Sequence, residues 1–496
     1  MLVRLRLVAV LSLIVASCGT MLPDEDFEAA SREVIEERVV GASGPGAPGG
    51  QAGAEGQAGT AGQTVTEGGT GGGSGGGGTG GGGGSDGAPN QASDVGVTES
   101  VIRVGNITAV QGYLGPEAFT PMRRGVSTYF QVLNERGGVN GRKVEFTSCD
   151  DRESPDLNLE CARRLVESQQ VFALVGNTTD TYRAARYVSD SGVPDIGGQP
   201  IGNAYYKYPT LFSVLGAEGY PRDGTQVGQG GQLYVQTGQY RYFKQQAGVT
   251  KAAVFFYNIP ISKTAGEFLA DGLRREGVEV VYTPNNGSGT NPAAPSFDTD
   301  VIQMRSRGVD TVWNAIDVAG FQKLCQAMDR QGFTVKANVS TIQGWSQKVG
   351  QDFSDPCKDA IYAWGESAPY GDATNPVIAP VLEALERYDP GGTLHQWNID
   401  GWAAGQMFTD AVASMGPAPT RAGVIDFLNQ QRDYTAGGIM GAVDWRPQVD
   451  DFNSFRMCVS VARWDDAAGL FVNVLGEPFR CETAPWYPYT PNDDGS

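Results

Sequence analysis

From Val97 onward, short runs of β-branched and aliphatic residues alternate with longer amphipathic stretches. The run "VIRVGNITA" at 101–109 and the later "KVEFTSC" are typical of strands. Between them, "AFTPMRRGVSTYFQVLNERGG" places its apolar residues on one side of a helix that ends at two glycines. Strands that alternate with helices predict a parallel sheet covered by helices, so the expected fold class is α/β.

The alternation then starts again with a strand at 251–258 and helices at 262–276, 298–307 and 318–332. Because single hydrophobic cores stop growing at about 250–300 residues, two successive series predict two Rossmann-like lobes joined by a hinge. The helical stretch 376–432 is expected to return to the first lobe. The expected bounds are 97–217 plus about 371–445 for the first lobe, 218–370 plus about 446–486 for the second, and 487–496 for a tail.

Near its start the chain has two arginines, Arg4 and Arg6, followed by an apolar run from Leu7 to Ala16. This run is too short to span a bilayer. Such a segment is typical of an export signal. The residues up to Cys18, "VASC", resemble the lipobox of bacterial lipoproteins. We therefore expect residues 1–18 to be a lipoprotein signal peptide with lipidation at Cys18. An ordinary signal peptide with a chance cysteine is the alternative.

Residues 19–40 form a short charged segment, after which the composition changes abruptly. Residues 41–96 are dominated by glycine, most extremely in "GGTGGGSGGGGTGGGGGSDG". A stretch with so little apolar surface cannot offset its ordering entropy, so we expect a flexible tether that reaches about 40 Å. A low-complexity insertion whose reach was not selected is the alternative.

The formal net charge of −19 argues against a nucleic-acid partner, which requires a basic face, and against docking on anionic lipid. Six cysteines remain after Cys18, and an even number in an exported chain predicts three disulfides. The sequence leaves their connectivity open. Because consecutive cysteines are close in sequence, pairing in chain order is our expectation for Cys149, Cys161, Cys325, Cys357, Cys458 and Cys481. Their spacing, without a nearby histidine, does not favour a metal site.

Several stretches resemble the leucine/isoleucine/valine-binding family of type I periplasmic binding proteins. They are "IRVGNITAVQGYLGP", "VLNERGGVNGRKVEF", "DDRESPDLNLECARRLVES", "VFALVGNTTD" and "FDTDVIQMRSRGVDTVW". The most specific piece is N-x-x-G-G-V-N-G-R-K at 134–143, and the likeness covers roughly residues 99–485. Together with the lipobox, this resemblance implies the lipid-anchored solute receptor of an ABC importer.

The resemblance implies a monomer on the outer face of the cell membrane that binds a small solute and membrane permease subunits and uses no cofactor. A sensory receptor of the same fold, passing its signal to a membrane partner, is the alternative function. An enzyme is disfavoured, because the chain contains one histidine, His395, which we expect on a surface loop, and has no G-x-S-x-G, P-loop or HExxH motif.

In open α/β sheets ligands bind beyond the carboxyl ends of the strands, so candidate contacts follow the strands directly. The candidates are Gln111, Tyr113, Thr178, Thr179, Gln199 and Ile201 in the first lobe, and Tyr257, Asp317, Gln343 and Trp345 in the second. In "FALVGNTTDTYRAARYV" the threonines follow a strand and precede an expected helix, whose positive end favours a carboxylate or carbonyl oxygen.

Each candidate also has a purely structural alternative. The two threonines are then only helix caps, Tyr113 packs on the hinge, Trp345 lies in the core, and Asp317 is a solvated cap. The family typically holds an amino-acid ammonium with an acidic residue where this chain has Gln343, and Ile201 stands where those members use threonine. We therefore expect a small neutral or singly anionic polar solute, such as an amide, a urea-like compound or a carboxylic acid, rather than leucine.

Overall fold

The computed structural model describes residues 89–216, 222–228, 230–446, 457–482 and 486–492, which belong to one compact unit, Gly84–Ser496. The expected signal peptide, the lipidation at Cys18, the charged segment 19–40 and most of the tether lie outside the described residues.

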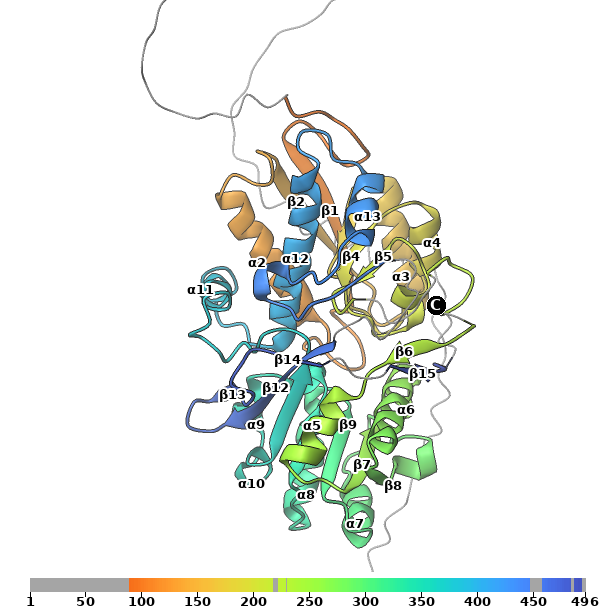
Figure 1. The fold of residues 1–496 in the computed structure, drawn as a ribbon, viewed down its shortest axis with the longest axis vertical. Coiled ribbons are helices and arrows are strands. Elements are labelled where there is room, and N and C mark those ends of the chain that lie inside the picture. Colours follow the sequence, from red (N-terminus) through yellow and green to blue (C-terminus); the bar gives the residue numbers. More distant parts are fainter. Residues whose placement is uncertain (1–88, 217–221, 229, 447–456, 483–485, 493–496) are drawn as a thin grey trace, which may run out of the picture. The chain divides into compact units, whose positions relative to one another are not determined.

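The first lobe is built on a parallel five-stranded sheet (Figure 1). The order of its strands across the sheet is β2-β1-β3-β4-β5. The chain begins at β1, places β2 on one side of it and then adds β3, β4 and β5 on the other side, so the order of the strands reverses between β1 and β3. The bounds are β1 Val101–Thr108, β2 Lys143–Asp150, β3 Ala173–Val175, β4 Asp195–Gly198 and β5 Leu211–Ser213. This second-first-third-fourth-fifth order is the flavodoxin-like one, which binds ligands where the direction reverses.

The second lobe repeats this order in its own sheet, with parallel strands β8-β7-β9-β10-β11. Their bounds are β7 Lys251–Phe256, β8 Glu279–Tyr282, β9 Thr311–Ala315, β10 Ala337–Ser340 and β11 Ile361–Gly365. Three antiparallel strands extend the sheet beyond β11: β12 Met457–Asp465, β13 Leu470–Asn473 and β14 Arg480–Glu482. Two lobes of similar topology are therefore present, as expected from the restarted pattern.

The helices fall into the same two groups. Those of the first lobe are α2 Thr120–Glu135, α3 Pro155–Arg163, α4 Ala185–Asp190, α11 Ala379–Tyr388, α12 Gln396–Ser414 and α13 Arg421–Asn429. Those of the second lobe are α5 Gly238–Gln246, α6 Pro260–Arg275, α7 Asp298–Ser306, α8 Val318–Arg330, α9 Lys348–Asp352 and α10 Asp355–Lys358. Short helical turns complete them: η1 Arg164–Ser168, η2 Asn203–Tyr206, η3 Pro284–Gly287, η4 Ile342–Gly344 and η5 Ala436–Gly438.

Helix α12 returns to the first lobe and packs on α2 and β4. The two helices approach closely because glycines face the partner backbone. A Cβ at Gly125 would lie 2.1 Å from the carbonyl oxygen of Asn398, and one at Gly401 would lie 2.1 Å from that of Met122. Beside this crossing, Phe130 of α2 meets Phe408 of α12 edge-on, with ring centroids 5.6 Å apart. Aromatic packing at this contact fixes the long helix that later contributes to the site.

Three disulfides join the six cysteines, and they pair in the expected chain order. Cys149–Cys161 ties β2 to α3, Cys325–Cys357 ties α8 to α10, and Cys458–Cys481 ties β12 to β14. Each lobe is thus cross-linked internally. None of the three bonds connects one lobe to the other.

Both ends of the folded unit differ from the expectation. At the N-terminal end, residues expected in the tether are bound to the first lobe, where the guanidinium of Arg142 donates to the side chain of Asn90 and the carbonyl of Gln91. At the other end, part of the expected tail forms a strand, β15 Tyr487–Tyr489, which pairs with β6 Leu233–Val235. Backbone hydrogen bonds therefore order both segments, which composition alone does not indicate.

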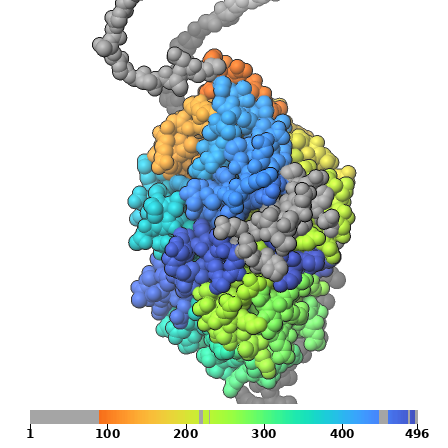
Figure 2. Space-filling model, in the orientation of Figure 1, coloured from red at the N-terminus to blue at the C-terminus, as the bar shows by residue number. Residues whose placement is uncertain are grey.

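The segment after β12 lies along both lobes. Figure 2 shows it in dark blue between the light-blue first-lobe helices and the green second-lobe elements. At its end, the carbonyl of Asn492 accepts a hydrogen bond of 2.7 Å from the side chain of Asn203, just after β4. The side-chain amide of Asn492 bonds Glu267 of α6. The C-terminal segment therefore connects the two lobes in this conformation.

Candidate functional site

A cavity of about 210 Å³ lies between the two lobes, where the carboxyl ends of strands from both sheets face each other. The first lobe contributes residues that follow β1, β4 and β5 and one residue of α12, and the second lobe contributes residues that follow β7, β9 and β10. The wall consists of Leu114, Phe119, Gln199, Pro200, Ile201, Leu215 and Trp397 from the first lobe and Tyr257, Ile259, Ile261, Ser262, Ala265, Ala315, Ile316, Asp317, Thr341, Ile342 and Gln343 from the second. This is the position that the topology assigns to a ligand.

Half of the residues proposed from the sequence line this cavity. They are Gln199, Ile201, Tyr257, Asp317 and Gln343. All five follow a strand within a few residues, which is the signal that led to them. The structure therefore brings these five together in one wall, three from the second lobe and two from the first.

Asp317 holds the second-lobe wall together. It is the N-cap of α8, and its carboxylate accepts hydrogen bonds from the peptide N–H groups of Ala319 at 3.2 Å and Gly320 at 3.3 Å. The same carboxylate accepts the hydroxyl of Tyr257 at 2.6 Å, and burial, followed by the charge of Asp317, raises the pKa of that phenol. Asp317 thus caps the helix and also orients the aromatic ring of the wall.

Gln199 is held from behind by a buried carboxylate. Its Nε2 donates a 2.6 Å hydrogen bond to Asp400, which lies on α12 and is fully buried. Burial raises the pKa of Asp400 to about 6. Because the amide nitrogen is engaged, the Gln199 oxygen is the polar atom that remains for a ligand.

His395 links α12 to the second lobe. Its Nδ1 accepts the peptide N–H of Trp397 at 3.0 Å, and its Nε2 lies 3.0 Å from the carbonyl oxygen of Gln343, so the proton resides on Nε2. The expectation of a surface loop was wrong, since this residue is 3% exposed and caps α12. Burial lowers the pKa of His395 to about 4, which keeps the ring neutral.

The threonine turn after β3 does not start a helix. Helix α4 begins only at Ala185, because the backbone of Thr178 continues the sheet and pairs with Thr108 at the end of β1. The Thr178 hydroxyl donates to the carbonyl of Gly176 at 3.3 Å, and the Thr179 hydroxyl donates to Asp151. Both threonines are buried and neither lines the cavity. The expected helix start at these threonines was therefore wrong.

Gln111 and Tyr113 lie on an exposed loop after β1, beside an acidic cluster. The Tyr113 hydroxyl donates to Asp180 at 3.3 Å, and its peptide N–H donates to Glu153 at 2.8 Å. Burial, followed by the charges of Glu153 and Asp151, raises the pKa of Asp180 to about 7. Neither Gln111 nor Tyr113 lines the cavity, although Leu114, the next residue along the chain, does.

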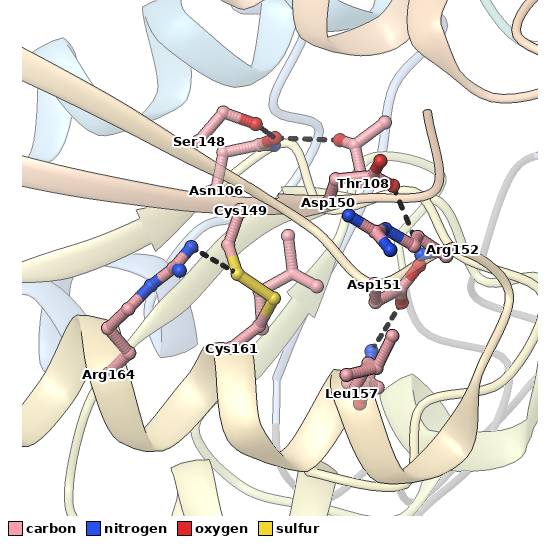
Figure 3. Close-up of a disulfide and its surroundings, with 12 residues drawn as sticks. Asn106, Thr108, Ser148, Cys149, Asp150, Asp151, Arg152, Leu157, Cys161 and Arg164 are labelled. Carbon is pink, nitrogen blue, oxygen red and sulfur yellow. Dashed lines mark hydrogen bonds between the residues drawn. A yellow bond between two sulfur atoms is a disulfide. The ribbon is translucent and has the colours of Figure 1, made fainter. Parts of the chain in front are cut away.

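The disulfide Cys149–Cys161 anchors this acidic cluster. Figure 3 shows it directly beside Asp150 and Asp151, where β2 ends and the chain turns toward α3. The side chain of Asp151 is fully buried and accepts a 2.8 Å hydrogen bond from Asn158. The strand-end groups of this part of the first lobe therefore bond mainly to one another.

Trp345 belongs to the core. It is fully buried and packs near Phe471 and Tyr370, with ring centroids 6.0 and 6.5 Å away. Gln343, two residues earlier in the chain, lines the cavity instead. The core alternative that the sequence left open for Trp345 is the one that the packing favours.

Most of the cavity residues that the sequence reasoning missed are apolar. Ile259 and Ile342 also follow strands, so the strand-end rule applies to them as it does to Ile201, but it was used mainly for polar and aromatic side chains. Trp397 carried no such signal, because it lies in the first turn of α12, far along the sequence from any strand of its lobe. Its ring stacks on Phe119, with centroids 6.4 Å apart and planes inclined by 19°.

A family model described as periplasmic binding protein matches residues 101–469. The chain belongs to the periplasmic binding protein family. Members of this family are extracytoplasmic proteins that bind solutes, and substrate-binding members of ABC transporters interact with permeases. The model ends before β13, so the last strands and the C-terminal segment lie beyond the matched part.

Curated relatives are distant. The Leu/Ile/Val-binding protein homolog 1 of Brucella abortus (strain 2308) is 23% identical over 309 residues, which cover 61% of this chain and 76% of the relative. An amino acid binding protein of Pseudomonas aeruginosa is 25% identical over 222 residues, covering 43% of this chain and 53% of that protein.

Solved structures share the fold at low identity. A fatty acid ABC transporter substrate-binding protein from Thermomonospora curvata matches with a TM-score of 0.62 at 14% identity, covering 78% of this chain and 94% of that one. A solute-binding protein from R. palustris, solved with benzoate, has a TM-score of 0.58 at 16% identity, with 78% and 98% covered. A leucine-binding protein from Thermotoga maritima has a TM-score of 0.59 at 14% identity, with 75% and 97% covered.

Within the described ranges, His, Cys, Asp and Glu side chains form no group of three or more that could hold a metal ion. No helix in the same ranges has the length and apolar character needed to cross a bilayer.

Proposed function

We propose that this protein is the extracytoplasmic solute-binding lipoprotein of an ABC importer and that it captures one small molecule between its lobes. The observation that carries the proposal is the interlobe cavity, because its wall is assembled from strand ends of both sheets. A ligand that touches both lobes binds their closed arrangement better than an open one. It therefore shifts the population toward closure without any further device.

The proposal is one of binding and not of catalysis. Among the described residues of the wall, the only hydroxyl nucleophiles of serine or threonine are Ser262 and Thr341, and none is a histidine, cysteine or lysine. The Ser262 hydroxyl already donates to the carbonyl of Ala315 at 2.5 Å and accepts the peptide N–H of Tyr257 at 2.8 Å. A hydroxyl engaged in this way, with no base beside it, is a structural group.

The membrane anchor is proposed from the sequence. Lipidation at Cys18 would hold the chain on the outer face of the cell membrane, and the glycine-rich segment would let the lobes reach a permease. Replacing Cys18 by alanine is expected to move the protein from the membrane fraction to the soluble fraction and to abolish incorporation of labelled palmitate. Retention of both in Cys18→Ala would rule out this anchor.

Ligand capture is tested by screening the purified protein against a panel of amides, alcohols, carboxylates and amino acids by thermal shift. A ligand at 100 times its Kd raises the stability by about 2.7 kcal/mol, which is easily detected. The affinity of each hit is then measured by calorimetry in wild type and in Ala265→Phe. Ala265 is a half-buried residue of α6 that lines the cavity, so a phenylalanine at this position would fill it. Hits that bind both proteins equally would place the ligand elsewhere and contradict the proposal.

A further inference from the structure

The geometry points to a definite ligand class: a neutral, mainly apolar molecule with one uncharged hydrogen-bonding group. This inference rests on the proposed function, since it concerns the same cavity, and it excludes carboxylates and α-amino acids. It goes against the polar solute expected from the sequence, because most of the strand-end candidates chosen from the sequence were polar or aromatic, with Ile201 as the exception.

The walls of the cavity are mostly aliphatic and aromatic. The first lobe contributes Leu114, Leu215 and the stacked pair Phe119 and Trp397. From the second lobe come the apolar side chains Ile259, Ile261, Ala265, Ala315, Ile316 and Ile342. A surface of this kind rewards burial of a hydrocarbon body at about 25 cal/mol per Å² and offers little to a strongly hydrated solute.

The charges around the cavity disfavour an anion. Among the described residues that line it, none is a lysine, arginine or histidine, and the one carboxylate is that of Asp317, which is 9% exposed. The adjoining hollow shares Leu114, Asp317 and Gln343 with the cavity, and there a single lysine, Lys348, is outnumbered by Glu117 and Asp352. A ligand carboxylate would therefore lose its hydration next to a negative charge and gain no paired cation.

The same carboxylate is poorly placed to hold an ammonium group. Three donors already occupy Asp317: the Tyr257 hydroxyl and the first N–H groups of α8. An ammonium at this point would compete with the helix cap for the same oxygens. The zwitterion of an amino acid would thus find neither a free carboxylate nor a cation in this wall.

Uncharged polar groups remain that suit a single amide, carbonyl or hydroxyl. The Gln199 amide presents its oxygen once Nε2 is bound to Asp400. On the opposite side, α6 begins at Pro260 without a side-chain cap, and Ile259, Ile261 and Ser262 at this helix start line the cavity. The first N–H groups of a helix have no partner within it, so they can donate to a ligand oxygen. One acceptor and one set of donors facing an apolar chamber define the proposed class.

The test compares molecules that share a carbon skeleton and differ only in the polar group. Calorimetry is carried out with the full protein on isocaproamide, isohexanol, isocaproate and leucine, and on benzamide, benzyl alcohol and benzoate. In each series the neutral members should bind at least about 10-fold more tightly than the charged ones. This difference is the penalty expected when one unpaired charge is partly desolvated. Binding should be lost in Ala265→Phe, with Ile342→Phe as a second blocking variant in case the first fails to fold.

Two variants examine the charge argument directly. Asp317→Asn keeps a good helix cap and removes the negative charge, so affinity for isocaproate should rise about 10-fold while that for isocaproamide stays within about 2-fold. Gln343→Lys places a cation at the half-exposed rim and should make the carboxylates the better ligands. A selectivity that neither variant changes would overturn the electrostatic basis of the proposal.

The remaining outcomes separate the ligand class from the proposed function. If a carboxylate or leucine binds wild type as tightly as the matched neutral compound, and the blocking variants abolish it, the ligand class is wrong and the capture function stands. If no neutral member binds wild type, the ligand class is also overturned. If, in addition, no compound of the wider panel binds in a way that the blocking variants abolish, the capture function fails with it.

Discussion

The third strands of the two lobes, β3 and β9, are followed by segments of different structure. After β9 in the second lobe, Asp317 caps α8, and the helix begins at Val318, three residues beyond the strand. After β3 in the first lobe, the chain stays extended past Thr178 and reaches α4 only at Ala185. Two sheets with the same strand order can therefore differ in the structure of the segments that follow their strands.

This difference assigns the two lobes different roles. In the first lobe, the groups that follow β2 and β3 bind one another, as Thr179 does to Asp151 and Asn158 does to Asp151. The first-lobe wall of the cavity comes instead from residues that follow β1, β4 and β5 and from α12. In the second lobe, the ends of β7, β9 and β10 form the wall directly. In the first lobe the groups after β2 and β3 thus bond to one another away from the cavity, whereas in the second lobe the groups after β7 and β9 bond to one another within its wall.

The largest expected effect is the loss of stability when a disulfide is removed, and it should differ between the two lobes. Cys325–Cys357 closes a separation of 32 residues and Cys149–Cys161 one of 12. Replacing each pair by alanine should lower the free energy of unfolding by about 4 kcal/mol in the second lobe and about 3 kcal/mol in the first, because a longer loop regains more entropy when unfolded. Urea denaturation of the two variants measures both values.

A larger loss from the shorter loop would reverse this order. It would show that Cys149–Cys161 acts mainly by holding the turn at Asp150 and Asp151 in place. The matched control is the Cys458–Cys481 pair, which has an intermediate separation of 23 residues and lies in the second lobe.

The next prediction concerns the link between the lobes at His395. The folded protein binds a proton there only below about pH 4, whereas the unfolded chain binds one near pH 6.5. Between these values the unfolded state holds more protons, so this residue should lower stability by up to about 3 kcal/mol as the pH falls from 6.5 to 4. His395→Asn retains a capping side chain and does not titrate.

The measurement is the difference in unfolding free energy between His395→Asn and wild type across this range. Buried carboxyl groups with raised pKa values, such as Asp195 and Asp400 at about 6, act in the opposite direction but are present in both proteins. A difference that is constant with pH would show that His395 is not held neutral by burial.

A smaller effect distinguishes a structural threonine from a ligand contact. The double change Thr178→Val and Thr179→Val should cost about 1–3 kcal/mol of stability, because buried Asp151 loses a donor. Affinity for any cavity ligand should stay within about 2-fold, since neither residue lines the wall. A clear loss of affinity at unchanged stability would return the threonine turn to the site.

The smallest effect is expected at the second-lobe rim. Gln343→Ala should weaken a cavity ligand by about 10-fold, or about 1.4 kcal/mol, with little change in the melting temperature, because the side chain is half-buried and caps no element. The two lobes would then differ as the structure implies: the change at Thr179 in the first lobe would lower stability, and the change at Gln343 in the second lobe would lower ligand affinity. Equal affinity in Gln343→Ala and wild type would contradict this assignment.

The strand-end rule found Gln199, Tyr257 and Asp317 because the position of a residue just after a strand can be read from the local pattern. It did not find Trp397, which comes from a helix that returns from far along the chain. It also selected Trp345, because two residues of difference in a turn decide whether a side chain meets the cavity or the core. Local patterns do not contain that information.

By itself, the sequence determined the α/β class and the repeated series that becomes two sheets, and it indicated the strand ends as the place of the candidate site. These features depend on residue periodicity, which acts over a few residues. The tertiary structure alone decided that Thr178 pairs with β1 instead of starting a helix, that His395 is buried, and that the cavity is lined by apolar groups from both lobes. The physical reason is that each of these outcomes depends on which distant side chains compete for the same hydrogen bond or the same space.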